Sequence, residues 1–443
     1  MRHEVRARAA LVAVVLVLCL PAASDAQCPG CLHAGAASVD LRVLPGAPLA
    51  GYGSVARRLL PPDVLGRHPH AFWFKPHAGT LDPLGARALV LDDGTTRLTW
   101  VAVDLIAVDR AFTREVERRL LAAGLPRSTL IISASHTHSG PGAFIDSALV
   151  GLVAADRADA PVRDALIGSI VDAVRRAERA RGPARVSALS VNAPAVTVSR
   201  LGQPLDPEIT ILKFVSATGA PVALVWNFAI HATMLGPRNL ELSGDVTGAA
   251  SRTLERDLGV PVLFVNGAVG DVSPRRHGRP ALAEVGSALA AAVRAGWNAA
   301  PAGWPASLAV RTARVELPPP ALSLRNCIAD WIPGALRLPL ARALPGDAEL
   351  VAAAVGDTVW VTIPGELQTR LGLEVKRGVR PAWARAFVAG VSNDYLGYFL
   401  AAADYDRVAY VACASLYGPE GGARLSRAAG DLLAALRGGG AGR

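Results

Sequence analysis

Two histidines spaced two residues apart, His136 and His138, stand just after an apolar run at 130–132. Such a run predicts a buried strand, and side chains at i and i+2 of an extended segment point the same way. Both imidazole rings can then converge on one small object, and a metal ion is the natural candidate. The Ser-Gly-Pro-Gly sequence at 139–142 ends the strand and opens a loop, where sites usually lie. The pair suggests a metal site; hydrogen bonding within the core is the alternative.

A second pair with the same spacing, His68 and His70, serves as an internal comparison. It lies among proline, arginine and aromatic residues with no strand before it. We therefore expect this pair to lie in a loop.

Two further residues stand where a metal site could use them. His231 follows the strand-like run at 225–230, and Glu366 stands where a predicted strand turns into a helix. A zinc site assembled from separate strands needs another histidine at a strand end. A carboxylate at a helix start also gains from the helix dipole, so Glu366 has a purely local interpretation as a first-turn acid.

A glycine-containing loop at 266–274 follows the predicted strand at 262–265 and carries Ser273. The serine can be a nucleophile, an oxyanion donor or a turn residue. The loop lacks the spacing of the α/β-hydrolase nucleophile elbow and of phosphate or dinucleotide loops.

Tyrosine is concentrated near the end of the chain. Five of the six tyrosines fall in one short segment: Tyr395, Tyr398, Tyr405, Tyr410 and Tyr417. Phenols can ligate a metal or hydrogen-bond, so the cluster suggests a polar rim around chemistry. Aromatic packing is the alternative for Tyr398 and Tyr410.

The composition predicts a globular, exported protein. Of 443 residues, 51% are hydrophobic and 19% charged, with a formal net charge of +9. Residues 1–26 have the basic, apolar and small-residue regions of a signal peptide, which predicts a secreted or periplasmic protein cleaved after Ala26. Lipidation at Cys28 is a lesser alternative. The scattered arginines argue against nucleic-acid binding and are compatible with contact to an anionic membrane surface.

Four cysteines remain after the leader: Cys28, Cys31, Cys327 and Cys413. An even number in an exported protein suggests disulfides, with three pairings open. For Cys28 and Cys31 a local or terminal-stapling disulfide is favoured over a redox pair or half a zinc knuckle.

Short apolar runs alternate with amphipathic stretches, as in a layered α/β protein. We expect a mixed sheet with helices packed around it, in one large catalytic domain over 27–443. The predicted strands are 88–91, 99–103, 130–132, 209–214, 222–226, 262–265 and 359–362, and the predicted helices are 113–123, 162–180, 247–257, 281–295 and 425–436. A proline- and arginine-rich stretch at 317–344 is interpreted as an insertion or lid.

Taken in order, these motifs resemble the catalytic domain of neutral/alkaline non-lysosomal ceramidases. The resemblance rests on 136–142, His231, the run 270–274, the Pro-Gly-Glu at 364–366 and the tyrosine segment, with Gly51-Tyr52-Gly53 and Ser243-Gly244-Asp245 as further landmarks. It implies zinc held by His136, His231, Glu366 and Tyr395. It also implies that the scissile amide is surrounded by His138, Arg200, Ser273, Tyr405 and Tyr417.

The resemblance implies a zinc-dependent amidohydrolase that cleaves the N-acyl bond of ceramide or a related lipid. Water activated by zinc would be the nucleophile, His138 would exchange the proton, and Tyr405 and Arg200 would stabilise the oxyanion. A direct attack by Ser273 is the weaker variant.

Three departures from the family pattern keep other functions open. Ser199-Arg200-Leu201 stands where the family usually has Asn-Arg-Ser, Arg275 follows the serine motif in place of asparagine, and we expect no C-terminal immunoglobulin-like domain. The alternatives are a zinc hydrolase of non-lipid amides or esters, and a non-catalytic envelope binding protein on the same scaffold.

Overall fold

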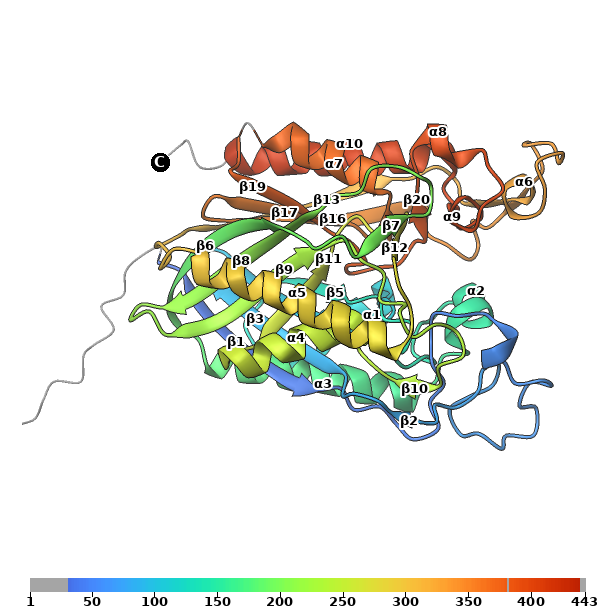
Figure 1. Ribbon diagram of the computed structural model, residues 1–443, viewed down its shortest axis with the longest axis horizontal. Helices are drawn as coiled ribbons and strands as arrows, with labels where there is room; N and C mark the ends of the chain where they lie inside the picture. The colour runs from blue at the N-terminus through green and yellow to red at the C-terminus, as the bar shows by residue number, and fades with distance from the viewer. Residues whose placement is uncertain (1–30, 381, 439–443) are drawn as a thin grey trace, which may run out of the picture.

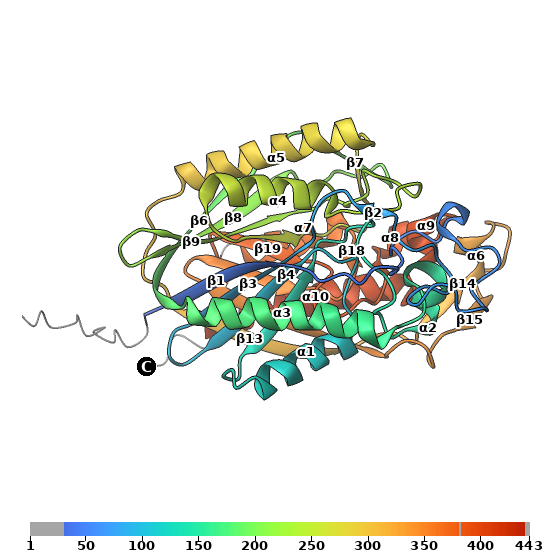
Figure 2. The same ribbon diagram turned by 90° about the horizontal axis from the view of Figure 1, so that it is seen from below.

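The computed structural model describes residues 31–380 and 382–438 as four layers, in the order helices, sheet, sheet, helices (Figures 1 and 2). The predicted leader at 1–26 and Cys28 lie outside the described residues. Within the described ranges, no helix is long and apolar enough to cross a membrane. The expectation of a layered α/β fold with a mixed sheet is confirmed.

The larger sheet has eight strands and is mostly antiparallel, with parallel pairing at both edges. In spatial order its strands are β11 (Val262–Asn266), β9 (Pro221–Phe228), β8 (Glu208–Ser216), β6 (Gly182–Asn192), β1 (His33–Asp40), β3 (Gly85–Asp92), β4 (Arg97–Val103) and β5 (Thr129–Ala134). The smaller sheet has four: β13 (Leu308–Glu316), β16 (Asp347–Val355), β17 (Thr358–Thr362) and β19 (Arg385–Ala389).

The two sheets pack against each other through a buried aromatic contact. The indole rings of Trp100 on β4 and Trp360 on β17 are stacked with centroids 4.8 Å apart, and Phe387 on β19 stacks on Trp360 at 5.6 Å. All three side chains are fully or almost fully buried. Burial of each such side chain stabilises the fold by about 1.5–3 kcal/mol, which ties the two sheets into one core.

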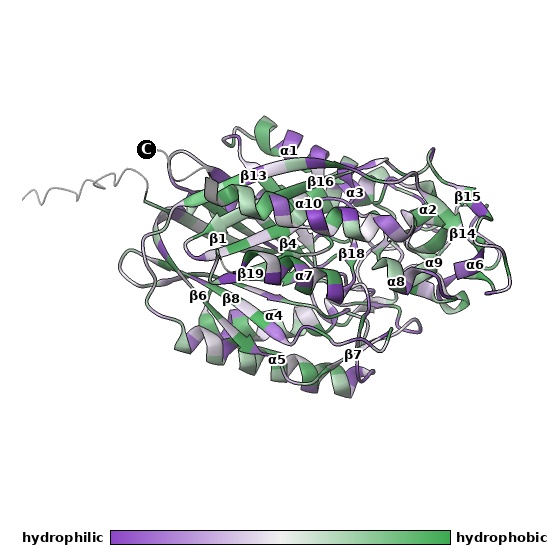
Figure 3. Cartoon of the chain, turned by 90° about the horizontal axis from the view of Figure 1, so that it is seen from above, coloured by the Kyte–Doolittle hydropathy of each residue, from purple (hydrophilic) through white to green (hydrophobic). Residues whose placement is uncertain are grey.

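Helices cover the outer faces of both sheets, and the hydropathy pattern follows these layers (Figure 3). The larger sheet carries α1 (Arg110–Ala122) and α3 (Ala160–Arg179) on one half, and α4 (Asp245–Leu258) and α5 (Arg279–Ala299) on the other. The smaller sheet carries α7 (Thr369–Val379) and α10 (Gly418–Gly438).

Helix α3 shows why these sequences form amphipathic helices. Asp159 caps it by accepting a hydrogen bond from the backbone N–H of Val162, and Pro161 stands in the first turn. Both residue types are favoured at those positions. Its buried residues recur at helical spacing: Val162, Leu166, Ile167, Ile170, Ala173, Val174 and Ala177. One face therefore packs on the sheet while the charged face meets solvent.

Short elements gather at one end of the sheets, on the right in Figure 1. They are η1 (Val55–Arg57), β2 (Gly79–Thr80), α2 (Ala148–Val150), η2 (Gly151–Ala155), β7 (Thr197–Ser199), β10 (Glu241–Leu242), β12 (Val272–Pro274), β18 (Glu366–Leu367), β20 (Tyr398–Phe399), α8 (Ala402–Tyr405) and α9 (Tyr410–Cys413). These elements carry the candidate functional residues.

The proline- and arginine-rich stretch folds into β14 (Ala321–Ser323), α6 (Leu324–Cys327) and β15 (Arg337–Pro339). A disulfide joins Cys327 to Cys413 of α9, so two of the four predicted cysteines pair across 86 residues. The asparagine side chain of Asn326 adds a hydrogen bond to the backbone carbonyl of Tyr405 at 2.9 Å. The stretch is thus an appendage fastened to the tyrosine segment.

Candidate metal centre and catalytic cavity

His136 and His138 lie in the loop after β5, and they converge for a reason that the sequence did not reveal. We expected an extended segment with both rings on one side, but β5 ends at Ala134 and His136 has φ 63°, in the left-handed region. The two rings therefore meet nearly edge to face, with centroids 5.1 Å apart. The expectation of strand alternation was wrong. The two rings do converge, but they do so because the backbone turns at His136. The comparison pair lies in a loop as predicted, where His70 contacts Asp159.

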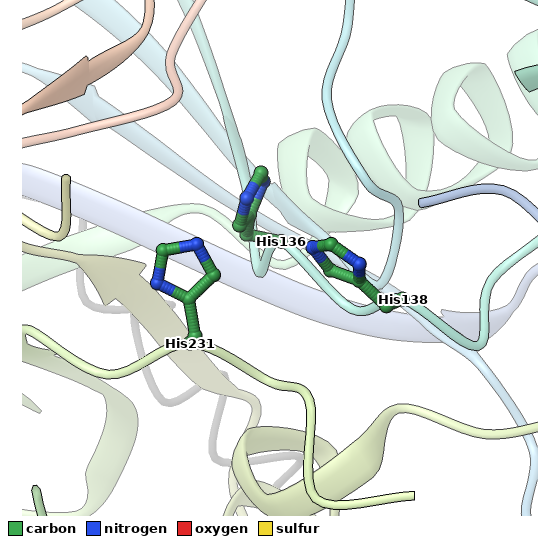
Figure 4. A group of neighbouring side chains, drawn as sticks. All are labelled: His136, His138 and His231. Carbon is green, nitrogen blue, oxygen red and sulfur yellow. The ribbon is translucent and has the colours of Figure 1, made fainter. Parts of the chain in front are cut away.

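His231 reaches the same point from the loop after β9. A bridge between Thr137 and Ala232 holds the two histidine-bearing segments side by side. The imidazole centroid of His231 lies 4.8 Å from that of His136 and 6.0 Å from that of His138. Figure 4 shows the three rings facing one another from two loops, one carrying His136 and His138 and the other His231. Their nearest ligand atoms lie within 4.8 Å of one another, so this group could hold a metal ion.

Glu366 completes the cluster from β18, the short strand that follows β17 in the chain. Its Oε1 lies 3.2 Å from His136 Nε2, and its Oε2 lies 2.9 Å from His231 Nε2. The phenol of Tyr395 donates a hydrogen bond to Glu366 Oε1 at 2.6 Å. The structure thus brings together the four residues that the family resemblance implies as metal ligands, from three distant parts of the chain.

Gly365 lets the backbone before Glu366 pass close to a neighbouring strand. A Cβ at this position would lie 2.5 Å from the carbonyl oxygen of Gly397, and the residue has φ 153°. Only glycine avoids that contact. The parallel pairing of β18 with β20 then places Glu366 opposite Tyr398.

Several buried polar atoms in this cluster have no hydrogen-bond partner. They are His136 Nε2, both ring nitrogens of His138, both ring nitrogens of His231, and Glu366 Oε2. The carboxylate lies close to two imidazoles without forming a hydrogen bond to either ring. His136 Nδ1 is 2.7 Å from the carbonyl of Ile106, which fixes that nitrogen as the donor and leaves Nε2 for a ligand. Buried atoms without partners are costly, and a cation would satisfy them.

The charge states of the cluster suit a metal. Burial lowers the pKa of His138 well below its usual range and that of His231 to about 4, with Arg200 adding to the effect at His231. Both rings are then neutral near pH 7, the form that binds metals. Burial alone would raise the pKa of Glu366, but His136 and His231 outweigh it and hold that pKa well below its usual range.

Tyr395 is a phenol in this arrangement. Burial, with a further contribution from Glu366, raises the pKa of Tyr395 well above its usual range. To ligate a metal as a phenolate it must lose the proton that it now donates to Glu366.

A cavity of about 420 Å³ opens beside His138. It is lined by Gly51, Tyr52, Gly53, His138, Arg200, Thr233, Gly236, Pro237, Ser273, His277, Tyr398 and Tyr410. The pairing of β7 with β12 sets Arg200 beside Ser273, and Arg200 Nε donates to Ser273 Oγ at 2.7 Å. Arg200 also donates through Nη1 to the phenol oxygen of Tyr398 at 3.3 Å. A cationic donor therefore stands in the cavity next to the histidine cluster.

The structure places Tyr405 and Tyr417 elsewhere. Arg337 lies over the Tyr405 ring, and the Tyr417 hydroxyl donates to the carbonyl of Pro345 at 2.8 Å, with its ring stacked on Phe399. Neither residue lines the cavity. The cavity is lined instead by Tyr398 and Tyr410, for which the sequence left aromatic packing open as the alternative. Tyrosine spacing alone could not separate these pairs, because the pairing of β20 with β18 places Tyr398, and Tyr410 reaches the cavity from α9.

Arg57 is a residue that the sequence analysis missed. It is 1% exposed and donates through Nη1 to the carbonyls of Ala50 at 2.8 Å and His138 at 2.7 Å. Its guanidinium lies 4.8 Å from the ring centroid of Tyr52, and that ring lies 4.6 Å from the His138 ring. Its closeness in the sequence to Gly51-Tyr52-Gly53 was the signal that could have pointed to it. Arginine is rarely buried without a role.

Comparisons with known proteins point to one family. The family model described as neutral/alkaline non-lysosomal ceramidase, N-terminal, matches residues 75–284, which include all three clustered histidines, Arg200 and Ser273. Over these residues the chain is similar to the neutral/alkaline non-lysosomal ceramidase family. Glu366 and Tyr395 lie outside the matched region, so their place in the site comes from the structure and from the motif resemblance.

Similar proteins include the neutral ceramidase of Pseudomonas aeruginosa, which is 28% identical over 217 residues, 44% of this chain and 32% of the relative. The neutral ceramidase of Mycobacterium tuberculosis is 28% identical over 233 residues, 45% of this chain and 36% of the relative. The matches thus span about a third of the length of these relatives. The crystal structure of the Pseudomonas aeruginosa neutral ceramidase superposes with a TM-score of 0.76 at 20% identity, covering 92% of this chain and 75% of that one, which shows the shared fold.

Proposed function

We propose that this protein is an exported zinc-dependent amidohydrolase that cleaves the N-acyl amide bond of ceramide or a related N-acyl lipid. One observation carries the proposal. His136, His231, Glu366 and Tyr395 converge in a buried cluster beside a cavity that holds Arg200 and Ser273. In this cluster His136 Nε2, both ring nitrogens of His231 and Glu366 Oε2 lack hydrogen-bond partners.

The donor set suits zinc. Two imidazoles, a carboxylate and a phenol oxygen are nitrogen and oxygen ligands of intermediate hardness, as in catalytic zinc sites. When bound, zinc polarises a carbonyl and lowers the pKa of water to about 7. The three-histidine set that includes His138 is the alternative arrangement. We assign His138 to proton transfer because it lines the cavity, whereas Glu366 contacts both other histidines directly.

His138 is placed to move a proton. Its ring is neutral, lies beside the cluster and has both nitrogens free of hydrogen bonds. It can accept a proton from an attacking water and return it to the leaving amine. Arg57 and Tyr52 hold the backbone and ring of His138 in place.

Arg200 and Ser273 are placed to stabilise negative charge on the amide oxygen. Ser273 Oγ accepts from Arg200, so its own proton is free for a further hydrogen bond. The guanidinium cannot act as a base for Ser273, which favours attack by water over attack by the serine. Tyr398, held by Arg200, replaces Tyr405 in the proposed oxyanion-stabilising group.

The substrate class is argued from the relatives and the cavity. The relatives are named neutral ceramidases, and a second superposed structure is titled as a ceramidase complexed with C2. A cavity of about 420 Å³ has room for an amide and its neighbouring atoms, and the tyrosines on its wall offer apolar ring faces.

A substrate panel on the purified full chain tests the proposal. N-acyl sphingosine should yield amine and fatty acid in equal amounts, and a chelator should abolish the reaction until zinc is returned. Hydrolysis confined to N-acyl amino acids or simple esters would refute the lipid assignment. Protein that binds no metal and cleaves none of the panel would refute the enzyme and favour a binding protein.

His70 provides a matched control for the metal ligands. It belongs to a histidine pair of the same spacing, and it contacts Asp159 away from the cluster. His136→Ala should lose zinc and activity, whereas His70→Ala should keep both.

Export is tested separately. We propose cleavage after Ala26, so mass spectrometry of the protein secreted or released from the periplasm should find Gln27 as its first residue. Retention of the leader, or a lipid on Cys28, would contradict this.

A further inference from the structure

Exposed apolar side chains are concentrated at the end of the molecule that carries the cavity. Among the described residues, thirteen large hydrophobic side chains are strongly exposed. All except Trp304 lie in or next to the short elements η1, η2, α6, β15 and α9. We call these twelve the apolar rim: Val55, Leu60, Val64, Leu65, Leu152, Val153, Ile328, Trp331, Leu336, Leu338, Val408 and Tyr410. Monomeric proteins rarely gather apolar side chains on one surface without a partner for it.

The rim surrounds the cavity on two sides. Gly51, Tyr52 and Gly53 line the cavity and lead into the loop that carries Val55 to Leu65. On the other side Tyr410 lines the cavity, 68% exposed, and begins α9. Figures 1 to 3 place α2, α6 and α9 at the same end of the molecule.

Covalent and hydrogen bonds fix the rim segments to the rest of the protein. The disulfide between Cys327 and Cys413 ties the segment with Trp331 to α9, and Arg58 Nη2 donates to the carbonyl of Leu152 at 2.7 Å, joining the two segments on the other side. Trp331 is 79% exposed, although the backbone around it is held in place. The apolar side chains are thus presented to solvent by anchored loops.

We propose that the apolar rim inserts into the surface of an anionic lipid bilayer and places the cavity mouth against it. Exposed tryptophan and tyrosine suit the interface between water and lipid. Residues 324–344 carry three arginines and one aspartate, and residues 53–67 carry three arginines, one of them the buried Arg57, and one aspartate. Both segments are therefore net positive, as binding to anionic lipid requires.

A bilayer fits better than a protein partner because of where the cavity lies. A protein seated on the rim would cover the cavity mouth, whereas a bilayer would deliver an acyl-chain substrate to it. This last step rests on the proposed function, but the exposure and charge of the rim do not.

The test measures binding of the metal-loaded full chain to vesicles of phosphatidylcholine with phosphatidylglycerol, by sedimentation. Trp331→Ser should weaken binding on the order of tenfold, because it removes a large apolar side chain from the lipid contact. Trp304→Ser is the matched control, since Trp304 is also exposed, at 69%, but pairs with Val186 of β6 away from the rim. It should bind like the unmodified protein. Equal loss in both variants, or no loss in Trp331→Ser, would overturn the proposal.

Fluorescence quenching by brominated lipids gives a second measurement that does not depend on affinity. Trp331→Phe should remove most of the quenching seen with vesicles, and Trp304→Phe should not. The unmodified protein could instead fail to bind vesicles and form a dimer that Trp331→Ser abolishes. That result would make the rim a self-association surface and overturn lipid docking.

Failure of docking is distinguishable from failure of the proposed function. A protein that hydrolyses detergent-dispersed N-acyl sphingosine but does not bind vesicles refutes docking alone. A protein that binds vesicles through Trp331 and hydrolyses nothing supports docking and refutes the amidohydrolase.

Discussion

Replacing Ser273 by alanine should slow turnover by roughly 10²–10³-fold while zinc stays bound, because a lost oxyanion donor has that effect. The hydroxyl accepts a hydrogen bond from Arg200 Nε at 2.7 Å, and its own proton is free for the substrate. The loss corresponds to about 3–4 kcal/mol of transition-state stabilisation. A hydrogen bond to a charged group contributes about 1.5–3 kcal/mol, so part of the effect is the displacement of Arg200.

A double-variant cycle separates the two contributions. Arg200→Met and Ser273→Ala touch the same pair, so their combined loss in kcat should be smaller than the product of the single losses, with a coupling of about 0.5–3 kcal/mol. The assay is kcat on N-acyl sphingosine with zinc content measured on every sample. Ser187→Ala is the control, because its hydroxyl donates to the carbonyl of Pro301, far from the cavity lining.

Near-normal kcat in Ser273→Ala with full zinc would refute the donor role and leave Ser273 as a structural residue of β12. A covalent acyl adduct trapped on Ser273 during turnover would instead refute attack by water.

Four further outcomes are expected. Tyr395→Phe should reduce kcat more than zinc content, because the histidines and Glu366 still hold the metal; equal loss of both would contradict this. Arg57→Met should lower kcat roughly tenfold with zinc retained, since it leaves the carbonyls of Ala50 and His138 without their donor; an unchanged kcat would remove its positioning role. Chelation should lower the Tm by several degrees, because the metal binds only the folded state, and an unchanged Tm would argue against a bound metal. Cys413→Ser should cost about 4 kcal/mol of unfolding free energy, as expected for a loop closed over 86 residues, and no change by denaturant titration would contradict this.

The strands that the sequence predicted are those with continuous apolar runs, such as β3, β5 and β11, which are buried on both faces. Strands β1 and β13 escaped prediction for opposite reasons. β1 is rich in small residues, and β13 alternates apolar and charged residues along a half-exposed edge. The division into two facing sheets was also not predictable. It depends on the contact between Trp100 and Trp360, which are 260 residues apart in the chain.

The candidate site was more predictable in its residues than in its geometry. His136, His231, Glu366 and Tyr395 could be selected because each follows a strand-like run or belongs to a recognisable motif. The left-handed backbone conformation of His136 could not be predicted, because no local sequence signal indicates it for a histidine. The position of Tyr398 beside Arg200 likewise depends on the pairing of two-residue strands distant in sequence.

The metal content of purified variants tests the central claim most directly. Elemental analysis should find about one zinc per chain in the unmodified protein, as in a mononuclear catalytic site. His136→Ala and His231→Ala should contain almost none, and His138→Ala should keep its zinc while losing activity. Unmodified protein without zinc, or full zinc occupancy in both His136→Ala and His231→Ala, would contradict the account.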